Sequence, residues 1–112
     1  MIEFIQVTVA VADVLEGERI ATALVERGLA ACVQIVGPVQ SIYRWQGRIE
    51  QAEERLLLIK TTEHQFSMLE SLVRELHSYE CPEIIATPIT DGSMNYLRWL
   101  SGECPGGGST TG

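Results

Sequence analysis

The 112-residue chain has few basic residues and no long hydrophobic run. Eight Lys and Arg stand singly against fifteen Asp and Glu, which gives a formal net charge of −7. A nucleic-acid partner is therefore not expected, because phosphate binding requires Lys and Arg to be concentrated on one face. The apolar stretch at residues 2–11 has no basic leader and is interrupted by polar residues. We therefore expect neither a signal peptide nor a membrane span.

Cysteines and catalytic motifs are also scarce. The three cysteines, Cys32, Cys81 and Cys104, are odd in number and widely spaced. This pattern indicates free thiols in a reducing cytoplasm rather than a disulfide framework. The chain has no Gly-rich phosphate loop, no Gly-x-Ser-x-Gly motif and no His-Glu-x-x-His motif. These absences predict that the protein is not an enzyme.

The apolar pattern predicts one α+β domain. Apolar residues make up 46 % of the chain, which is enough for a core, and the length leaves no room for a second domain. The segments predicted to be extended are residues 2–11, 29–36, 39–45, 48–61 and 84–89. Gly37-Pro38 is expected to form a bulge or kink, and Gln46-Gly47 a hairpin turn.

Capping residues predict three helices. Asp13 caps the first helix, with Glu16 completing a capping box, and Gly28 ends it. Thr62 is expected to cap a second helix with Gln65 as the partner in its capping box, and His77 falls in the last turn of that helix. Ser93 caps a short third helix. Residues 1–101 are therefore expected to fold, and residues 102–112, rich in Gly, Ser and Thr, to form a flexible tail.

The order of these elements is the split βαβ, or ferredoxin-like, arrangement. It predicts a four-stranded antiparallel sheet with two helices on one face, a long hairpin and a short C-terminal helix. One face of the sheet is left uncovered, and Ile42, Tyr43 and Trp45 place apolar side chains on the hairpin. Exposed aromatic residues at such a place are typical of an interface. We therefore expect a homo-oligomer with Tyr43 and Trp45 in its interface.

Several segments together resemble a known family. They are Ala31-Cys32-Val33-Gln34-Ile35, Ser41-Ile42-Tyr43-Arg44-Trp45-Gln46-Gly47-Arg48-Ile49, Glu54, Lys60-Thr61, His77-x-Tyr79-x-x-Pro82-Glu83-Ile84 and Tyr96-Leu97-x-Trp99. Their order over residues 2–101 is similar to that of the CutA divalent-cation-tolerance family. The resemblance implies a ferredoxin-like fold assembled as a tight homotrimer through the hairpin, similar in shape to the PII signalling proteins.

The resemblance also implies a role in tolerance of copper and other divalent cations. The copper ligands proposed in the family, a Cys near the end of the first strand and adjacent histidines, correspond here to Val9 and Leu76-His77. The candidate metal ligands that remain are His77, Cys81 and Glu83, since imidazole and thiolate suit copper or zinc. The alternative is a helix-ending His77 that bonds to a carboxylate or carbonyl, with Cys81 as a small buried residue.

A second candidate site consists of Glu54, Lys60 and Tyr79. These residues either form ordinary contacts on the sheet or line an intersubunit cleft that holds a small anion or a metal ion. The leading functional hypothesis is a cytoplasmic, trimeric, metal-responsive protein that binds copper or another divalent cation directly. The alternatives are a PII-like regulatory module, which binds a small molecule at intersubunit clefts and signals to a protein partner, and a structural scaffold.

Overall fold

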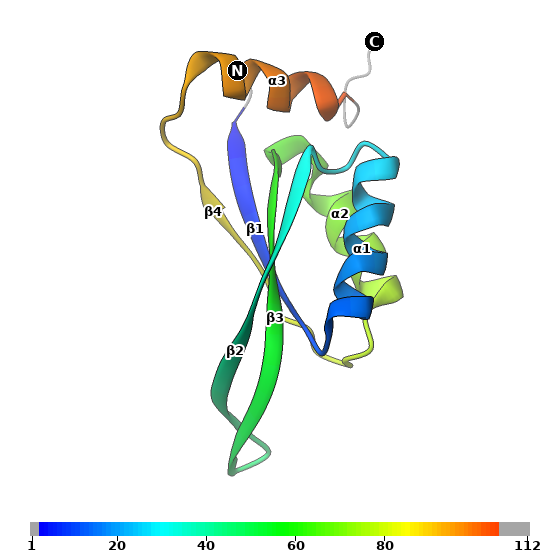
Figure 1. The fold of residues 1–112 in the computed structure, drawn as a ribbon, viewed down its shortest axis with the longest axis vertical. Coiled ribbons are helices and arrows are strands. Elements are labelled where there is room, and N and C mark those ends of the chain that lie inside the picture. Colours follow the sequence, from blue (N-terminus) through cyan, green and yellow to red (C-terminus); the bar gives the residue numbers. More distant parts are fainter. Residues whose placement is uncertain (1–2, 106–112) are drawn as a thin grey trace.

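Four strands form one antiparallel sheet in the order β2-β3-β1-β4. A computed structural model describes residues 3–105 of the chain. The strands are β1 (Phe4–Val11), β2 (Cys32–Trp45), β3 (Arg48–Thr62) and β4 (Ile84–Pro88). Helices α1 (Val14–Glu26) and α2 (Phe66–Leu76) pack side by side on one face of this sheet (Figure 1). This arrangement confirms the ferredoxin-like fold predicted from the sequence.

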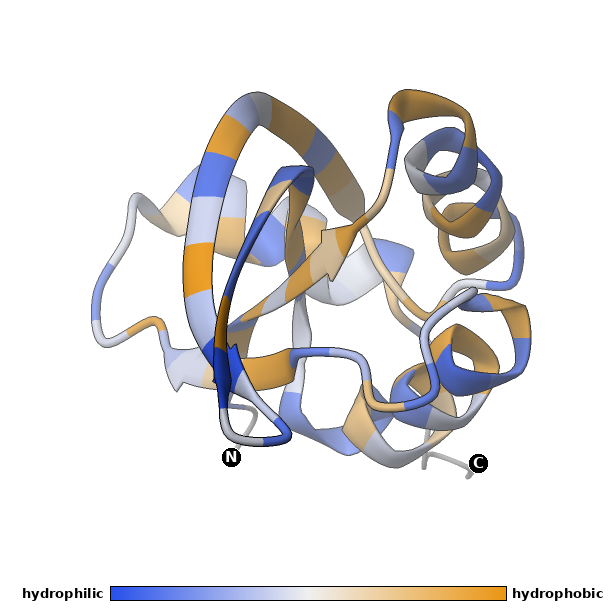
Figure 2. Cartoon of the chain, turned by 90° about the horizontal axis from the view of Figure 1, so that it is seen from below, coloured by the Kyte–Doolittle hydropathy of each residue, from blue (hydrophilic) through white to orange (hydrophobic). Residues whose placement is uncertain are grey.

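The core lies between the sheet and the two helices. Alternate residues of β1, from Ile5 to Val11, are buried, and Val7 and Val9 pair across the sheet with Ile59 and Leu57. From the helices, Ile20, Leu24, Leu69 and Val73 complete this core. Apolar and polar residues alternate along the strands (Figure 2), as expected where one face is covered and the other is open. None of the helices in the described range has the length and apolar character needed to cross a bilayer.

The predicted ends of α1 are confirmed. The Asp13 carboxylate accepts a hydrogen bond of 2.9 Å from the backbone N–H of Glu16. Gly28 has a φ of +70°, which is the left-handed conformation that commonly ends a helix.

The predicted capping box of the second helix is wrong. A short 3₁₀ turn, η1 (Glu63–Gln65), precedes α2, and Thr62 makes no side-chain hydrogen bond to the helix. The side chain of Gln65 points inward instead, and its amide nitrogen donates to the backbone oxygen of Cys104 at 3.2 Å. Gln65 therefore joins the start of α2 to the C-terminal segment.

Strands β2 and β3 form a hairpin that extends past the helices (Figure 1). The two extended segments predicted on either side of Gly37-Pro38 are one strand with a register shift between Val36 and Val39. Gly37 has a φ of +143°, and a Cβ there would lie 2.7 Å from Cδ of Arg55. At the tip, Gln46 and Gly47 have φ values of +51° and +80°, which confirms the predicted two-residue turn as type I′.

The length of the hairpin explains why it projects. The 14 residues of β2 span roughly 48 Å at about 3.4 Å per residue. The 13 residues of α1 span only roughly 20 Å at about 1.5 Å per residue. The far half of the hairpin therefore has no helix to cover it.

After β4, the described part of the chain contains helix α3 (Met94–Glu103) and the buried Cys104. Pro88 lies at the end of β4, which is an edge strand as predicted. Ser93 caps α3 by accepting from the N–H of Tyr96 at 3.3 Å. Cys104 is only 6 % exposed, so the predicted tail boundary at residue 102 is too early. The remainder of the predicted tail, residues 106–112, lies outside the described range.

Candidate functional site

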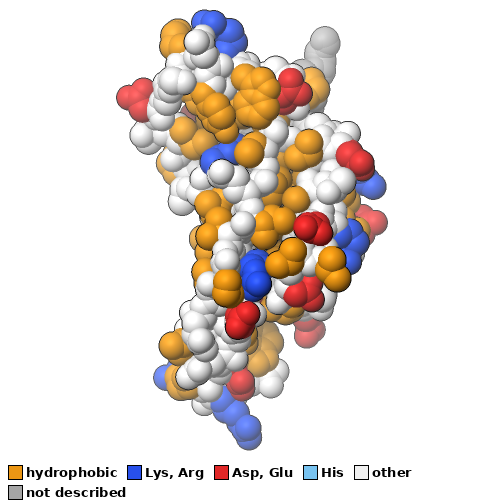
Figure 3. Space-filling view, in the orientation of Figure 1, with side chains coloured by type: hydrophobic (Ala, Val, Ile, Leu, Met, Phe, Trp, Pro, Cys, Tyr) orange, Lys and Arg blue, Asp and Glu red, His pale blue; other side chains and the backbone are white. Residues whose placement is uncertain are grey.

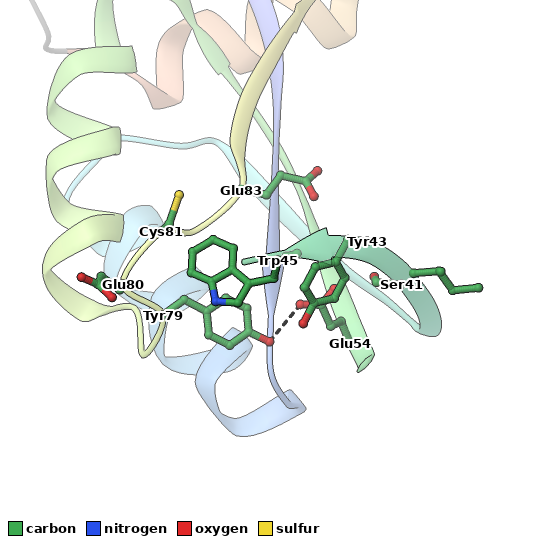
Figure 4. Close-up of a pocket in the computed structure, with 10 residues that line it drawn as sticks. Ser41, Tyr43, Trp45, Glu54, Tyr79, Glu80, Cys81 and Glu83 are labelled. Atoms are coloured by element: carbon green, nitrogen blue, oxygen red, sulfur yellow. Dashed lines mark hydrogen bonds between the residues drawn. The ribbon is translucent and has the colours of Figure 1, made fainter. Parts of the chain in front are cut away.

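A cavity of about 590 Å³ lies between the hairpin and the loop that connects α2 to β4 (Figure 4). Strands β1 and β3 supply Ala10 and Glu54, and the remaining lining residues come from β2 and from the loop. The ten residues that line it are Ala10, Ser41, Ile42, Tyr43, Trp45, Glu54, Tyr79, Glu80, Cys81 and Glu83. Its volume falls in the range of sites that hold small organic molecules.

Glu54 and Tyr79 meet directly inside this cavity. The Tyr79 hydroxyl donates a hydrogen bond of 2.9 Å to Oε2 of Glu54, which is only 7 % exposed. Burial, this hydrogen bond and the charge of the carboxylate raise the pKa of Tyr79 to about 12. The two residues were predicted to line one cleft, and the structure brings them together.

Lys60 does not belong to the cavity. It pairs with Cys32 and Gln6 on neighbouring strands, and its Nζ donates to Oε1 of Gln34 at 2.8 Å. Within one chain, Lys60 therefore lies outside the cavity that Glu54 and Tyr79 line, and the cleft between subunits stays a prediction. The parity of β3 places both Lys60 and Glu54 on the open face, but five residues of β3 lie between them.

The lining residues carry negative charge only. Three of them are carboxylates, Glu54, Glu80 and Glu83, and none of the ten is Lys, Arg or His. Cys81 is exposed rather than buried, which corrects the alternative that made it a core residue. It is one of the residues that line the cavity (Figure 4). A negatively charged cavity of this kind disfavours an anion and favours a cation.

His77 is an internal structural residue of this chain. Its side chain has no exposed surface, and its Nε2 lies 2.7 Å from the backbone oxygen of Ala10. Its Nδ1 accepts the backbone N–H of Tyr79 at 3.0 Å. These two contacts assign the neutral ring with the proton on Nε2. Both nitrogens are therefore occupied, as the alternative reading of a helix-ending histidine predicted.

Glu16 is a buried residue whose role the sequence pattern concealed. Its Oε1 accepts from the N–H of Ala12 at 3.2 Å and from the hydroxyl of Ser78 at 3.0 Å, and its Oε2 accepts from the N–H of Ser78 at 2.7 Å. Burial raises the pKa of Glu16, but the hydrogen bonds from Ser78 and Ala12 outweigh it and leave this pKa below its usual value. A capping box joins the Glu16 side chain to the N–H of Asp13, whereas the observed local donor is the N–H of Ala12. The spacing gave no sign of the distant contact with Ser78.

The predicted metal ligands do not form a metal centre within one chain. His77 is buried with both nitrogens engaged, whereas Cys81 and Glu83 lie on the surface. Over residues 3–105, no three His, Cys, Asp or Glu side chains are grouped closely enough to hold a metal ion. The predicted ligands His77, Cys81 and Glu83 therefore do not converge here.

The projecting hairpin exposes apolar side chains on both of its faces. Tyr43 and Trp45 are 44 % and 45 % exposed, and Ile42 and Ile49 are 66 % and 61 % exposed. Figure 3 shows apolar side chains along the strands down to the hairpin, where basic side chains project at the tip. Ile49 was not singled out from the sequence, although its alternation with polar neighbours gives the same signal as Ile42.

Known proteins resemble this chain over nearly its whole length. The family model described as "CutA1 divalent ion tolerance protein" matches residues 5–103. The "Divalent-cation tolerance protein CutA" of Thermus thermophilus is 50 % identical over 100 residues, which cover 89 % of this chain and 95 % of that protein. The "Protein CutA, chloroplastic" of Arabidopsis thaliana is 44 % identical over 84 residues, which cover 75 % of this chain and 46 % of that protein.

The solved structures give the same result. The crystal structure of CutA1 from the psychrotrophic bacterium Shewanella sp. SIB1 superimposes with a TM-score of 0.90 at 43 % identity, covering 93 % of this chain and 97 % of that one. This chain thus spans almost all of the Thermus and Shewanella proteins and about half of the Arabidopsis protein.

Proposed function

Because the chain belongs to the CutA1 divalent ion tolerance family, we propose that it acts in the tolerance of divalent cations as a homotrimer. The observation that supports assembly is the projecting hairpin. A two-stranded ribbon is marginally stable in water by itself, and this one carries Ile42, Tyr43, Trp45 and Ile49 on its surface. Packing against other copies of the chain covers part of this apolar surface and stabilises the ribbon.

Assembly is tested by native mass spectrometry of the full chain. The test variant carries Ile42→Glu and Ile49→Glu, which place two charges on the hairpin. The matched control is Met68→Glu, because Met68 is 59 % exposed on α2, away from the hairpin. We expect trimers for the unmodified chain and the control, and monomers for the double variant. A monomeric unmodified chain would refute the proposal.

A directly bound divalent cation requires donors from more than one subunit. In this version of the proposal, Cys81 and Glu83 on the cavity wall supply ligands, and a neighbouring copy completes the set. We expect the trimer to take up a stoichiometric number of Cu²⁺ ions that Cys81→Ser removes and Cys32→Ser retains. Scattered copper adducts of equal number in all three proteins would refute direct binding.

A cellular measurement tests tolerance independently of direct binding. The chain is expressed in a bacterial host that lacks its own family member, and growth is followed as the Cu²⁺ concentration rises. We expect the unmodified chain to restore growth and the monomeric hairpin variant to fail. Equal growth with the chain and with an empty vector would argue against the function.

The second candidate is a regulatory module that binds a small molecule, and the cavity favours it. A volume of about 590 Å³ is far larger than a bare ion needs and matches an organic ligand. In this version the bound state is passed to a protein partner. We expect a metabolite, rather than a metal, to raise the melting temperature of the trimer in a ligand screen; stabilisation by metals alone would count against it.

The free cysteines of the chain favour a cytoplasmic location of the protein. Cys32, Cys81 and Cys104 are all free, and free thiols persist in reducing compartments. The Arabidopsis relative is named as chloroplastic, so family membership by itself does not fix the compartment. Cell fractionation with an antibody against the chain tests this assignment.

A further inference from the structure

The carboxylate of Glu54 has no basic partner among the residues that the structure describes. Glu54 is 7 % exposed, and its one hydrogen bond within the described residues comes from the neutral hydroxyl of Tyr79. No Lys, Arg or His of residues 3–105 forms an ion pair with it. A carboxylate at such a depth is costly unless a cation compensates its charge. The cavity in front of Glu54 is the space from which such a cation can approach.

Aromatic residues line the same cavity as this carboxylate. Tyr43, Trp45 and Tyr79 are among the lining residues (Figure 4), and the Tyr79 hydroxyl contacts Glu54. The faces of tyrosine and tryptophan rings attract cations, and they attract alkylated ammonium groups without needing to strip a tightly bound water shell. Aromatic rings are not ligands for hard metal ions, which require several oxygen atoms around them. The combination of rings and carboxylates therefore selects an organic cation over a metal ion.

The other residues that line the cavity also favour an organic cation. Glu80 and Glu83 add negative charge at the rim, and Ala10 and Ile42 add apolar surface. Lys60, which would have supported an anionic ligand, lies outside the cavity and bonds to Gln34. The negative charge, the aromatic and apolar lining and the volume of the cavity thus favour an organic cation.

We propose that this cavity binds an organic ammonium ion, with Glu54 as its charge partner and with Tyr43, Trp45 and Tyr79 packed around its alkyl groups. This proposal rests on the small-molecule candidate for the function of the chain and names the class of that ligand. A primary ammonium group donates hydrogen bonds to Glu54, whereas a quaternary group relies on the rings. Both forms share the cationic nitrogen that the site selects.

The test is calorimetric titration of the assembled full chain with cyclohexylammonium and with cyclohexanol. These probes have nearly the same size and differ in charge. A titration with tetramethylammonium, at matched ionic strength, distinguishes a quaternary from a primary group. We expect saturable binding of at least one ammonium probe that is about tenfold tighter than that of the alcohol, since cation–π and carboxylate contacts of this kind contribute about 1.4 kcal/mol or more.

Two carboxyl-to-amide variants locate the site. Glu54→Gln keeps the shape of the side chain and its acceptor for Tyr79, and removes the charge. Glu53→Gln is the matched control, because Glu53 is the neighbouring residue of β3 and is paired with Arg55 at 3.5 Å. We expect Glu54→Gln to weaken ammonium binding about tenfold, and Glu53→Gln to leave it unchanged.

Three outcomes overturn the inference: no saturable ammonium binding, equal affinity for the ammonium ion and the alcohol, or equal affinity of the Glu54→Gln variant and the unmodified chain. Native mass spectrometry of the same samples separates this failure from that of the proposed function. Trimers that bind copper and no ammonium ion would refute the ammonium site and leave divalent-cation tolerance standing. Chains that do not assemble would refute the trimer, and ammonium binding by the monomer would still support the cavity.

Discussion

Oε2 of Glu16, at the start of α1, lies 3.5 Å from Nδ1 of His77, directly after α2. The same carboxylate accepts two hydrogen bonds from Ser78, and the His77 ring bonds to Ala10 and to the N–H of Tyr79. The pair therefore fastens the end of α2 to β1 and to the start of α1. Because Tyr79 lines the cavity, this buried network also fixes one wall of the candidate site.

Replacement of His77 by alanine should destabilise the fold. It leaves the oxygen of Ala10 and the N–H of Tyr79 without partners and opens a cavity, at a cost of about 2–4 kcal/mol. Thermal unfolding at fixed protein concentration measures this cost. His64→Ala is the control, because His64 lies exposed in η1, and should change stability by less than about 0.5 kcal/mol. A His77→Ala variant of full stability that loses bound copper would instead identify His77 as a metal ligand.

The lowered pKa of Glu16 predicts a pH-dependent loss of stability. A group with a lowered folded-state pKa stabilises the fold above its ordinary pKa, about 4.3 for glutamate, and this contribution is lost as pH falls through the folded value. Glu16→Gln should therefore lower stability at neutral pH by about 1–3 kcal/mol. The difference from the unmodified chain should shrink below about pH 4. Denaturant unfolding at a series of pH values checks this, and a difference that persists unchanged in acid would contradict it.

Tyr79 should ionise later than an ordinary tyrosine, because burial and Glu54 raise its pKa to about 12. Glu54→Gln removes the charge that opposes the tyrosinate, so it should lower this pKa. Ultraviolet difference titration detects the tyrosinate, and Tyr79→Phe identifies its share of the signal. At about pH 11, between the ordinary and the raised values, the Glu54→Gln variant should contain more tyrosinate than the unmodified chain. An identical titration of the two proteins would show that Glu54 does not influence Tyr79.

Truncation after Ser101 should destabilise the chain, whereas truncation after Pro105 should not. Cys104 is buried, its thiol lies 3.6 Å from Oγ1 of Thr61, and its backbone oxygen accepts from Gln65. Loss of this burial and hydrogen bonding should cost about 2–3 kcal/mol. Melting temperatures of both truncated chains and the full chain, at one concentration, measure the effect. Equal melting temperatures for all three would mean that the segment adds nothing to stability.

The elements that the sequence predicted well depend on local chemistry. Asp13 caps α1, Gly28 ends it, and Gln46-Gly47 forms the hairpin turn, because each depends on a few adjacent residues. The failed capping box at Thr62 has a tertiary cause. Gln65 has the right spacing for a cap, but its side chain bonds to Cys104, which no local pattern reveals.

In the candidate site, too, local patterns were easier to predict than contacts between distant segments. Within one chain, Glu54 and Tyr79 contact each other and Lys60 lies apart from them, and the contact of Glu16 with Ser78 was not predicted. Spacing along a strand predicts the face of the sheet on which a residue lies. It does not predict which residues of other segments contact it. The contact between Glu16 and Ser78 depends on how α1 and the end of α2 meet.

The sequence alone determined the ferredoxin-like order of elements, the long hairpin and the family, because alternation, helical spacing and capping act over short distances along the chain. Only the tertiary structure decided which polar residues face one another. It buried His77 against Ala10 and Tyr79, placed Lys60 outside the cavity, and put Glu54 in a cavity whose lining includes three aromatic residues and, over residues 3–105, no basic residue. These choices follow from the packing of segments far apart in the sequence, where the cost of burying a charge or an unpaired polar group selects the arrangement.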